Sequence, residues 1–170
     1  GAGDPQALER VDVASLVDRV RERFDESSSV ITTHVERPLG PILVRRLCLE
    51  VVLENLVSNA IKHGGGPVRV TASLAKERRG EAKEELLIIT VEDHGAGIPE
   101  DKIEEVFTPF FRLESGGGKT GLGLGLAVVK SIVTIMSGEI RLQSKPGEGT
   151  AVTVVIPVSN DIKMLSDTVG

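Results

Sequence analysis

The fold of this chain of 170 residues is decided by the stretch LLIITVEDHGAGIP, residues 86–99. Residues 86–92 are largely apolar, which predicts a central β-strand. Asp93 follows at the end of this strand, and Gly95 and Gly97 come next. Glycines let a backbone approach a flat base closely, and the carboxylate could accept a hydrogen bond from the amino group of adenine. An ordinary strand-to-helix turn, with Asp93 as a turn former, is the alternative at this point.

The segments around this strand predict a sheet with helices. Strands are expected at residues 29–36, 68–74, 86–92, 139–143 and 151–158. Helices are expected after Asp12 as N-cap, over residues 42–63, from Pro99 and over residues 126–136. The charged residues 76–85 are expected to form a hairpin loop. Together, these strands and helices predict an α/β two-layer sandwich, in which a mixed, mainly antiparallel sheet of about five strands is covered on one face by three helices.

Composition restricts the function classes. The chain has 20 Lys and Arg against 25 Asp and Glu, a formal charge of −5, which argues against nucleic acid as a partner. A single cysteine, Cys48, excludes a disulfide framework and fits a reducing, cytoplasmic setting. The apolar runs are too short to span a membrane. Three of the four phenylalanines are clustered, at Phe107, Phe110 and Phe111.

The length fits one domain. We expect residues 1–10 to be a tag or linker, residues 11–158 to form the domain, and residues 159–170 to be a tail.

The long helix over residues 42–63 carries a second motif. The apolar side that should pack on the sheet comprises Val44, Cys48, Val51 and Val52. Spacings of four and three continue this side with polar residues, namely Asn55, Asn59, Lys62 and His63. One interpretation is that the helix emerges into water here. The other is a ligand site, in which amide oxygens face Mg²⁺ and Lys62 faces phosphate.

A third motif, GLGLGL at residues 121–126, opens a helix. Free N–H groups at a helix N-terminus attract phosphate, and the glycines at 116–118 suit a lid. A flexible loop is the alternative. Residues 118–120 resemble the end of a P-loop, but Leu113 stands where that loop needs glycine. The glycine spacing also differs from the dinucleotide fingerprint.

Taken together, these stretches resemble the catalytic, ATP-binding domain of sensor histidine kinases, which belongs to the GHKL superfamily and has the Bergerat fold. Residues 55–63 resemble its N box, residues 93–99 its G1 box, and residues 107–112 its F box. Residues 121–126 resemble its G2 box, and residues 147–150 its last glycine motif. The resemblance covers nearly the whole chain, from about Val11 to Val158. Each motif is modest alone, but five motifs in the same order and spacing are a strong signal.

The resemblance implies a role for each matching residue. Asn59 would ligate Mg²⁺ with help from Asn55, and Lys62 would contact phosphate. Charge on the phosphates would be neutralised by Arg112 and Lys119 in the lid. Asp93 would bind adenine, with Thr150 supporting it through water. The phosphates would be cradled by Gly121, Gly123 and Gly125. The other implied nucleotide contacts are His63, Gly95, Gly97, Ile98, Leu122, Leu124 and Leu126. For Lys119, a solvated loop lysine is an equal alternative. Phe110 and Phe111 would either contact a partner or anchor the lid.

The resemblance also implies what the domain needs from outside. ATP-hydrolysing relatives and anti-sigma serine kinases usually have Glu where this chain has Asn55, so hydrolysis should be weak. Glu54 points about 100° away on the helix and is interpreted as a surface residue. His34 is expected to be a strand residue and not the phosphoacceptor, because Pro38 and Pro41 break any helix after it.

The implied function is to bind Mg²⁺ and ATP and to donate the γ-phosphoryl group to a histidine on a separate dimerisation domain of a two-component sensor kinase. The expected partners are therefore the dimerisation and phosphoacceptor helices of the same kinase, and indirectly a response regulator. The isolated domain is expected to be monomeric, and to be cytoplasmic or the cytoplasmic part of a membrane-bound sensor. Two other functions stay open at this stage. One is an anti-sigma-type serine kinase, against which Asn55 counts. The other is a nucleotide-sensing module that binds ATP without transferring phosphate.

Overall fold

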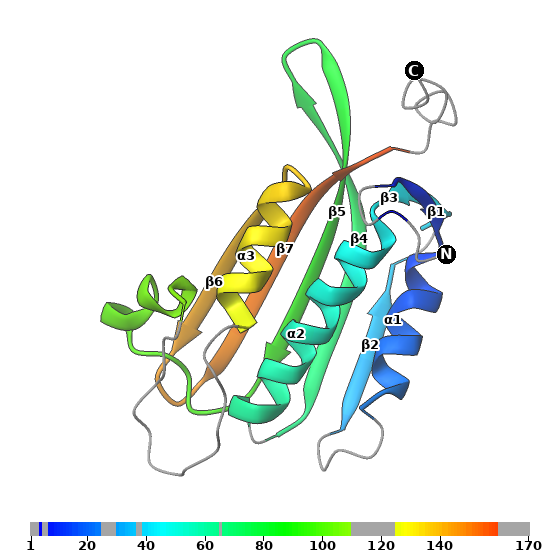
Figure 1. Ribbon diagram of the computed structural model, residues 1–170. Coiled ribbons are helices and arrows are strands. Elements are labelled where there is room, and N and C mark those ends of the chain that lie inside the picture. Colours follow the sequence, from blue (N-terminus) through cyan, green and yellow to red (C-terminus); the bar gives the residue numbers. More distant parts are fainter. Residues whose placement is uncertain are drawn as a thin grey trace.

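The structure is a computed structural model that describes residues 4, 7–24, 30–36, 39–64, 66–109 and 125–159. Its main sheet has five strands in the order β2-β4-β5-β7-β6 (Figure 1). The strands are β2 (Ile31–Val35), β4 (Val68–Arg79), β5 (Ala82–Asp93), β6 (Glu139–Lys145) and β7 (Gly149–Val158). β2 pairs parallel to β4, and the other neighbours pair antiparallel. The predicted central position of β5 is confirmed.

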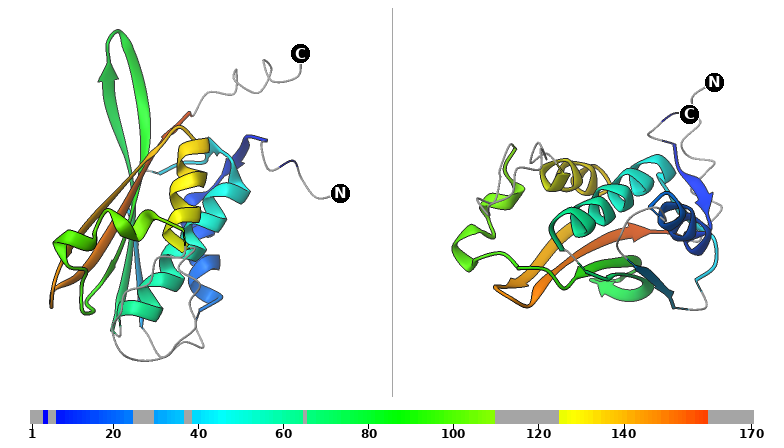
Figure 2. Two further views of the ribbon diagram at one scale, coloured as in Figure 1. Left: turned by 60° about the vertical axis from the view of Figure 1, so that its left-hand side comes forward. Right: turned by 90° about the horizontal axis from the view of Figure 1, so that it is seen from below.

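Within the described residues, three α-helices cover one face of this sheet (Figure 2). They are α1 (Val13–Glu22), α2 (Arg46–Gly64) and α3 (Gly125–Ile135). Two short 3₁₀-helices, η1 (Glu100–Lys102) and η2 (Glu105–Phe107), follow β5. The apolar sides of the α-helices and of the strands meet in one core. The two-layer sandwich predicted from the sequence is therefore confirmed.

Helix α1 forms where its sequence predicts. The Asp12 carboxylate accepts a hydrogen bond from the Ser15 backbone N–H at 3.0 Å, so Asp12 is the predicted N-cap. Four apolar residues at helical spacing are buried: Val13, Leu16, Val17 and Val20. Their burial fixes α1 against the sheet beside α2.

The start of α2 differs from the prediction. Residues 42–44 form strand β3 (Ile42–Val44), which pairs antiparallel with β1 (Glu9–Val11), and the helix begins only at Arg46. The apolar side predicted from Val44 and Val51 is also wrong, because Val44 lies in β3 and Val51 is exposed. The buried side of α2 is Leu49, Val52, Leu53, Leu56, Val57 and Ala60. Strand β1 likewise shows that residues 9 and 10 are part of the fold and not a linker.

The charged hairpin also differs from the prediction. The sequence predicts a loop over residues 76–85, but β4 continues to Arg79 and β5 starts at Ala82. Only Gly80 and Glu81 form the turn, and Gly80 has a positive φ of 64°. The two strands form a ribbon that extends beyond the rest of the sheet (Figure 1). An exposed ribbon needs no apolar side, so its composition resembles that of a loop.

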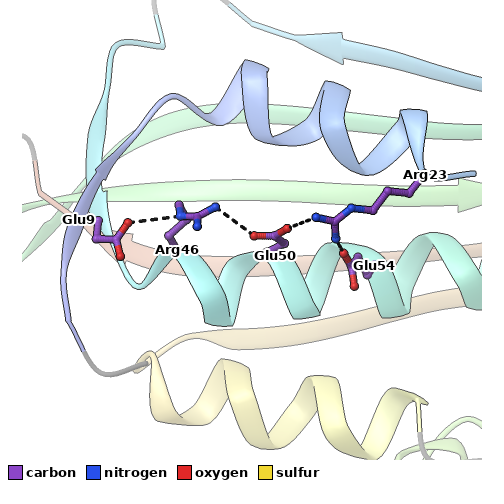
Figure 3. Close-up of polar contacts among 5 residues, drawn as sticks. All are labelled: Glu9, Arg23, Arg46, Glu50 and Glu54. Carbon is purple, nitrogen blue, oxygen red and sulfur yellow. Dashed lines mark hydrogen bonds and ion pairs between the residues drawn. The ribbon is translucent and has the colours of Figure 1, made fainter. Parts of the chain in front are cut away.

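An ion-pair cluster joins α2 to α1 and β1 (Figure 3). Glu50 accepts hydrogen bonds from Arg23 at 2.5 Å and from Arg46 at 3.2 Å. Arg46 also pairs with Glu9, and Arg23 also pairs with Glu54. The Glu50 side chain is only 13% exposed, so this cluster is better shielded from water than a typical surface pair. It links the first half of α2 to α1 and β1.

Candidate functional site

Three stretches that are far apart in the sequence meet at one end of the sheet: the end of α2, the end of β5 and the start of α3 (Figure 1). A Cβ atom placed on Gly64, the last residue of α2, would lie 2.6 Å from the Cβ atom of Asp93. A Cβ atom placed on Gly125, the first residue of α3, would lie 2.6 Å from Nδ2 of Asn59. The structure therefore brings Asn59 and Gly125, two of the predicted site residues, into contact, and places Asp93 beside the end of α2.

Asp93 is the carboxylate of this site. It is the last residue of β5, and it is half-buried. Its Oδ1 atom accepts a hydrogen bond from the backbone N–H of Gly95 at 2.9 Å. This bond fixes the carboxylate at the start of the turn and leaves Oδ2 available to a ligand.

The predicted glycines pack against protein backbone. A Cβ atom on Gly95 would lie 2.6 Å from both Gly64 Cα and the His63 carbonyl oxygen. Gly97 has a φ of 73° and lies against the carbonyl of Lys145, the last residue of β6. These glycines hold the loop after β5 close to α2 and to β6. Their predicted contact with a base stays a prediction.

Ser144 in β6 is a residue that the sequence analysis missed. Its hydroxyl accepts a hydrogen bond from the backbone N–H of Ile98 at 2.7 Å and donates one to the carbonyl of Gly149 at 2.9 Å. The same hydroxyl lies 2.9 Å from Oγ1 of Thr150, which stands directly opposite Asp93 in the β5–β7 register. Ser144 thus anchors the loop whose Ile98 side chain is buried. Support of Asp93 by Thr150 through water stays a prediction.

The polar residues of α2 follow one another toward its C-terminal end. The Asn55 side chain donates from Nδ2 to the carbonyl of Val51 at 2.7 Å, so its Oδ1 is available to a ligand. Asn59 is half-buried and lies under the first residue of α3, whereas Lys62 and His63 are exposed. The exposure of Lys62 and His63 fits both interpretations of this side of the helix. The cover over Asn59 favours a built site over a helix that simply emerges into water.

Several predicted site residues lie outside the described residues, namely Arg112, Lys119, Gly121, Leu122, Gly123 and Leu124, together with Phe110 and Phe111. Leu126 is described, and it packs against the core from α3. Its predicted nucleotide contact stays a prediction. His34 lies in β2, as predicted, and is exposed.

Phe107 joins the short helices to α3. The ammonium group of Lys130 lies 5.5 Å from the centre of the Phe107 ring, within the range of a cation–π contact. This contact connects η2, on one side of residues 108–124, with α3 on the other side.

A hollow of about 220 Å³ lies next to this site. Its lining includes Glu92, Gln143, Lys145 and Glu148, together with Asp93. Asp93 is thus shared by this hollow and by the meeting point of α2, β5 and α3, whereas none of the polar residues of α2 lines the hollow. In the described part of the chain, no group of three His, Cys, Asp or Glu could hold a metal ion, and no helix is long and apolar enough to cross a membrane.

Residues 44–160 match the family described as "Histidine kinase-, DNA gyrase B-, and HSP90-like ATPase". The chain belongs to this family. The matched range contains all three stretches that meet at the site. The chain is therefore a GHKL protein, as its five sequence motifs implied.

Relatives of this ATPase domain are sensor kinases. The sensor-like histidine kinase SenX3 of Mycolicibacterium smegmatis is 36% identical over 165 residues, which cover 94% of this chain and 41% of that protein. Full-length ShkA in complex with AMPPNP has a TM-score of 0.77 and 27% identity, and the match covers 95% of this chain and 33% of that one. The mycobacterial sensor histidine kinase MprB has a TM-score of 0.69 and 28% identity, over 89% of this chain and 98% of that one.

The ATPase domain therefore has the fold of a sensor histidine kinase catalytic domain and is an ATP-binding domain of that type. It spans less than half of the length of SenX3.

Proposed function

We propose that this domain binds Mg²⁺ and ATP where α2, β5 and α3 meet, and donates the γ-phosphoryl group to a histidine on a separate dimerisation domain. The observation that carries the proposal is the convergence of the Asp93 carboxylate and the Asn59 amide at one end of the sheet. The complex of the related ShkA with AMPPNP supports a nucleotide as the ligand.

The adenine end of the proposed site is Asp93. Because Oδ1 already accepts from the Gly95 N–H, Oδ2 is the oxygen available to the amino group of adenine. A carboxylate accepts this donor but would face the carbonyl oxygen of guanine, which has nothing to donate. The site should therefore select adenine nucleotides.

The phosphate end of the proposed site is α2 and the start of α3. Asn55 and Asn59 offer amide oxygens, which are ligands that suit a hard cation such as Mg²⁺. The use of Asn55 Nδ2 by the Val51 carbonyl leaves its oxygen for that purpose, so the donor set fits the ion. Bound Mg²⁺ would neutralise charge on the phosphates. Lys62 would contact phosphate, and Arg112, Lys119 and the glycines at 121–125 would complete the cradle.

The transfer step would depend on positioning. A neutral imidazole is a competent nucleophile near pH 7, so it needs no strong base in this domain. Glu54, the carboxylate next to Asn55, is paired with Arg23 and belongs to the ion-pair cluster. This arrangement favours a histidine acceptor over water or a serine hydroxyl. The acceptor helices would come from the same kinase, the response regulator would act after them, and the isolated domain would be monomeric.

Calorimetric titration with ATP, ADP and GTP, each with and without Mg²⁺, tests the binding step. We expect ATP and ADP to bind, Mg²⁺ to strengthen ATP binding, and GTP to bind far more weakly. Failure of both adenine nucleotides to bind would contradict the proposal.

Incubation with γ-labelled ATP and a purified dimerisation domain from a sensor histidine kinase tests the transfer step. Acid-labile, base-stable label on that domain is the expected result. Label on a partner's hydroxyl group would favour a serine kinase. Tight ATP binding without transfer to any dimerisation domain would favour a nucleotide-sensing module.

A further inference from the structure

The backbone conformation of Gly125 does not require glycine. The described glycines with positive φ are Gly80, Gly97, Gly147 and Gly149, and Gly125 is not among them. It is the first residue of α3 and has a conformation that any residue adopts. Alanine would be the better helix former here, so the absence of a side chain calls for another explanation.

The space beside Gly125 is filled by the amide group of Asn59. A Cβ atom on Gly125 would lie 2.6 Å from Nδ2, 2.7 Å from Oδ1 and 3.1 Å from Cγ of Asn59. Asn59 lies within α2, whose backbone is fixed by the core below it and by the ion-pair cluster beside it. A methyl group at position 125 would therefore displace the Asn59 amide and not the helix.

The Asn59 amide is also available to bind a ligand. Among the described residues it forms no hydrogen bond, whereas the neighbouring Asn55 uses its nitrogen within α2. Within the described part of the chain, this half-buried amide is therefore held by packing and not by hydrogen bonds. The residue that packs on it, Gly125, then determines where its oxygen points.

We propose that Gly125 is a positioning residue, whose missing side chain seats the Asn59 amide in the orientation that binds Mg²⁺ with ATP. This inference rests on the proposed function, in which Asn59 is a metal ligand. It differs from the role that the resemblance implied for Gly125, which was a direct contact with phosphate. The two roles predict different effects of a methyl group at this position.

A double-mutant cycle of Gly125→Ala and Asn59→Ala separates these roles. For each variant, calorimetry measures the affinity for ATP with and without Mg²⁺. We expect Gly125→Ala to reduce the gain in affinity that Mg²⁺ provides by about 10-fold, in the range found for residues that orient metal ligands. Binding without Mg²⁺ should be unchanged. In the Asn59→Ala background, Gly125→Ala should cause no further loss.

Gly40→Ala is the matched control, because a Cβ atom there would meet nothing within 4 Å. It should leave both affinities unchanged. Thermal unfolding provides a second measurement. If Gly125→Ala alone fails to fold, the double variant should fold, because Asn59→Ala removes the group with which the methyl collides. A double variant that also fails to fold would overturn the inference.

The failures of the two proposals are distinguishable. If Asn59→Ala keeps the full effect of Mg²⁺, Asn59 is not a metal ligand, and both the proposed metal site and this inference are overturned. If Asn59→Ala loses the effect while Gly125→Ala keeps it, only this inference is overturned. An equal loss of ATP binding with and without Mg²⁺ in Gly125→Ala would indicate a direct phosphate contact instead.

Discussion

Two polar side chains fix the loop after β5, one at each end. The Asp93 carboxylate accepts from the Gly95 N–H at the start of the loop, and the Ser144 hydroxyl accepts from the Ile98 N–H at its end. Between them, Gly97 lies against the carbonyl of Lys145. The loop is therefore held by protein contacts before any ligand binds, which preorganises the carboxylate for a nucleotide.

Replacement of Asp93 by asparagine tests this carboxylate. We expect Asp93→Asn to weaken ATP binding about 10- to 100-fold, since a hydrogen bond to a charged group contributes about 1.5–3 kcal/mol. The asparagine amide can still accept from the Gly95 N–H through its oxygen, but it then presents its NH₂ group to the amino group of adenine. Calorimetric titration with ATP measures the loss.

Glu92→Gln is the matched control, because Glu92 precedes Asp93 and its side chain projects from the opposite face of the strand. It should bind ATP as the parent domain does. An unchanged affinity for ATP in Asp93→Asn would remove Asp93 from the proposed site.

The residues of the proposed site could be selected from the sequence, but their contacts could not be predicted. The motif residues Asn55, Asn59 and Asp93 were found because their residue types and spacing match a known pattern. Ser144 carries no such signal. Its role arises only because the β6–β7 register places it beside Thr150, and register depends on the pairing of distant segments.

Helix α2 is the element that connects the site with the rest of the domain. On one side it presents Asn55 and Asn59, and on another it presents Glu50 and Glu54 to the arginines of the ion-pair cluster. Its buried side packs into the core between these two. The cluster should therefore set the position of α2 without touching the nucleotide.

Loss of the central charge of the cluster should affect stability and not binding. We expect Glu50→Gln to lower the free energy of unfolding by about 1 kcal/mol, because Glu50 is well shielded while its arginine partners are partly exposed. The effect should decrease at high salt. Urea unfolding at low and high salt measures both.

Glu139→Gln is the control, because Glu139 pairs with Arg141 on an exposed strand and should contribute less. Equal losses for the two variants would mean that the cluster contributes no more than a surface pair. ATP affinity should be unchanged in both variants.

The elements that could be predicted are those with one clear apolar side. Helix α1 and the alternating start of β4 formed as expected, because burial of a single side dictates their period. The start of α2 was mispredicted because residues 42–44 are buried in a three-residue strand, where every position is apolar and no period is visible. The charged ribbon of β4 and β5 lacks an apolar side altogether.

At the scale of the whole molecule, the contacts that join the two ends of the described chain lie far from the proposed site. Strand β3 pairs with β1 and also bridges Ser159, so the first and last described segments are joined beside it. The end of β5, whose last residue is Asp93, and the start of α3 lie at the opposite end of the sheet (Figure 1). The proposed site thus lies at one end of the main sheet, and the small β1–β3 sheet lies at the other.

The residues around Asn55 and Asn59 predict that the domain alone hydrolyses ATP slowly. No described carboxylate forms a hydrogen bond with the Asn55 or Asn59 amide, and Glu54, the nearest in sequence, is paired with Arg23. An amide cannot take a proton from water, so general-base catalysis, which typically contributes 10²–10⁴-fold, should be missing. A phosphate-release assay should therefore give a slow rate, and Glu54→Gln should leave it unchanged.

Glu50→Gln serves as the control in this assay, because it disturbs the same ion-pair cluster without altering the residue next to Asn55. A loss of hydrolysis in both variants would indicate that the cluster acts by positioning α2. A loss in Glu54→Gln alone would make Glu54 the base and place this domain with the hydrolysing members of its family. An unchanged slow rate, followed by transfer to an added dimerisation domain, is the result that phosphoryl transfer to histidine requires, because the nucleophile then comes from the partner and not from water.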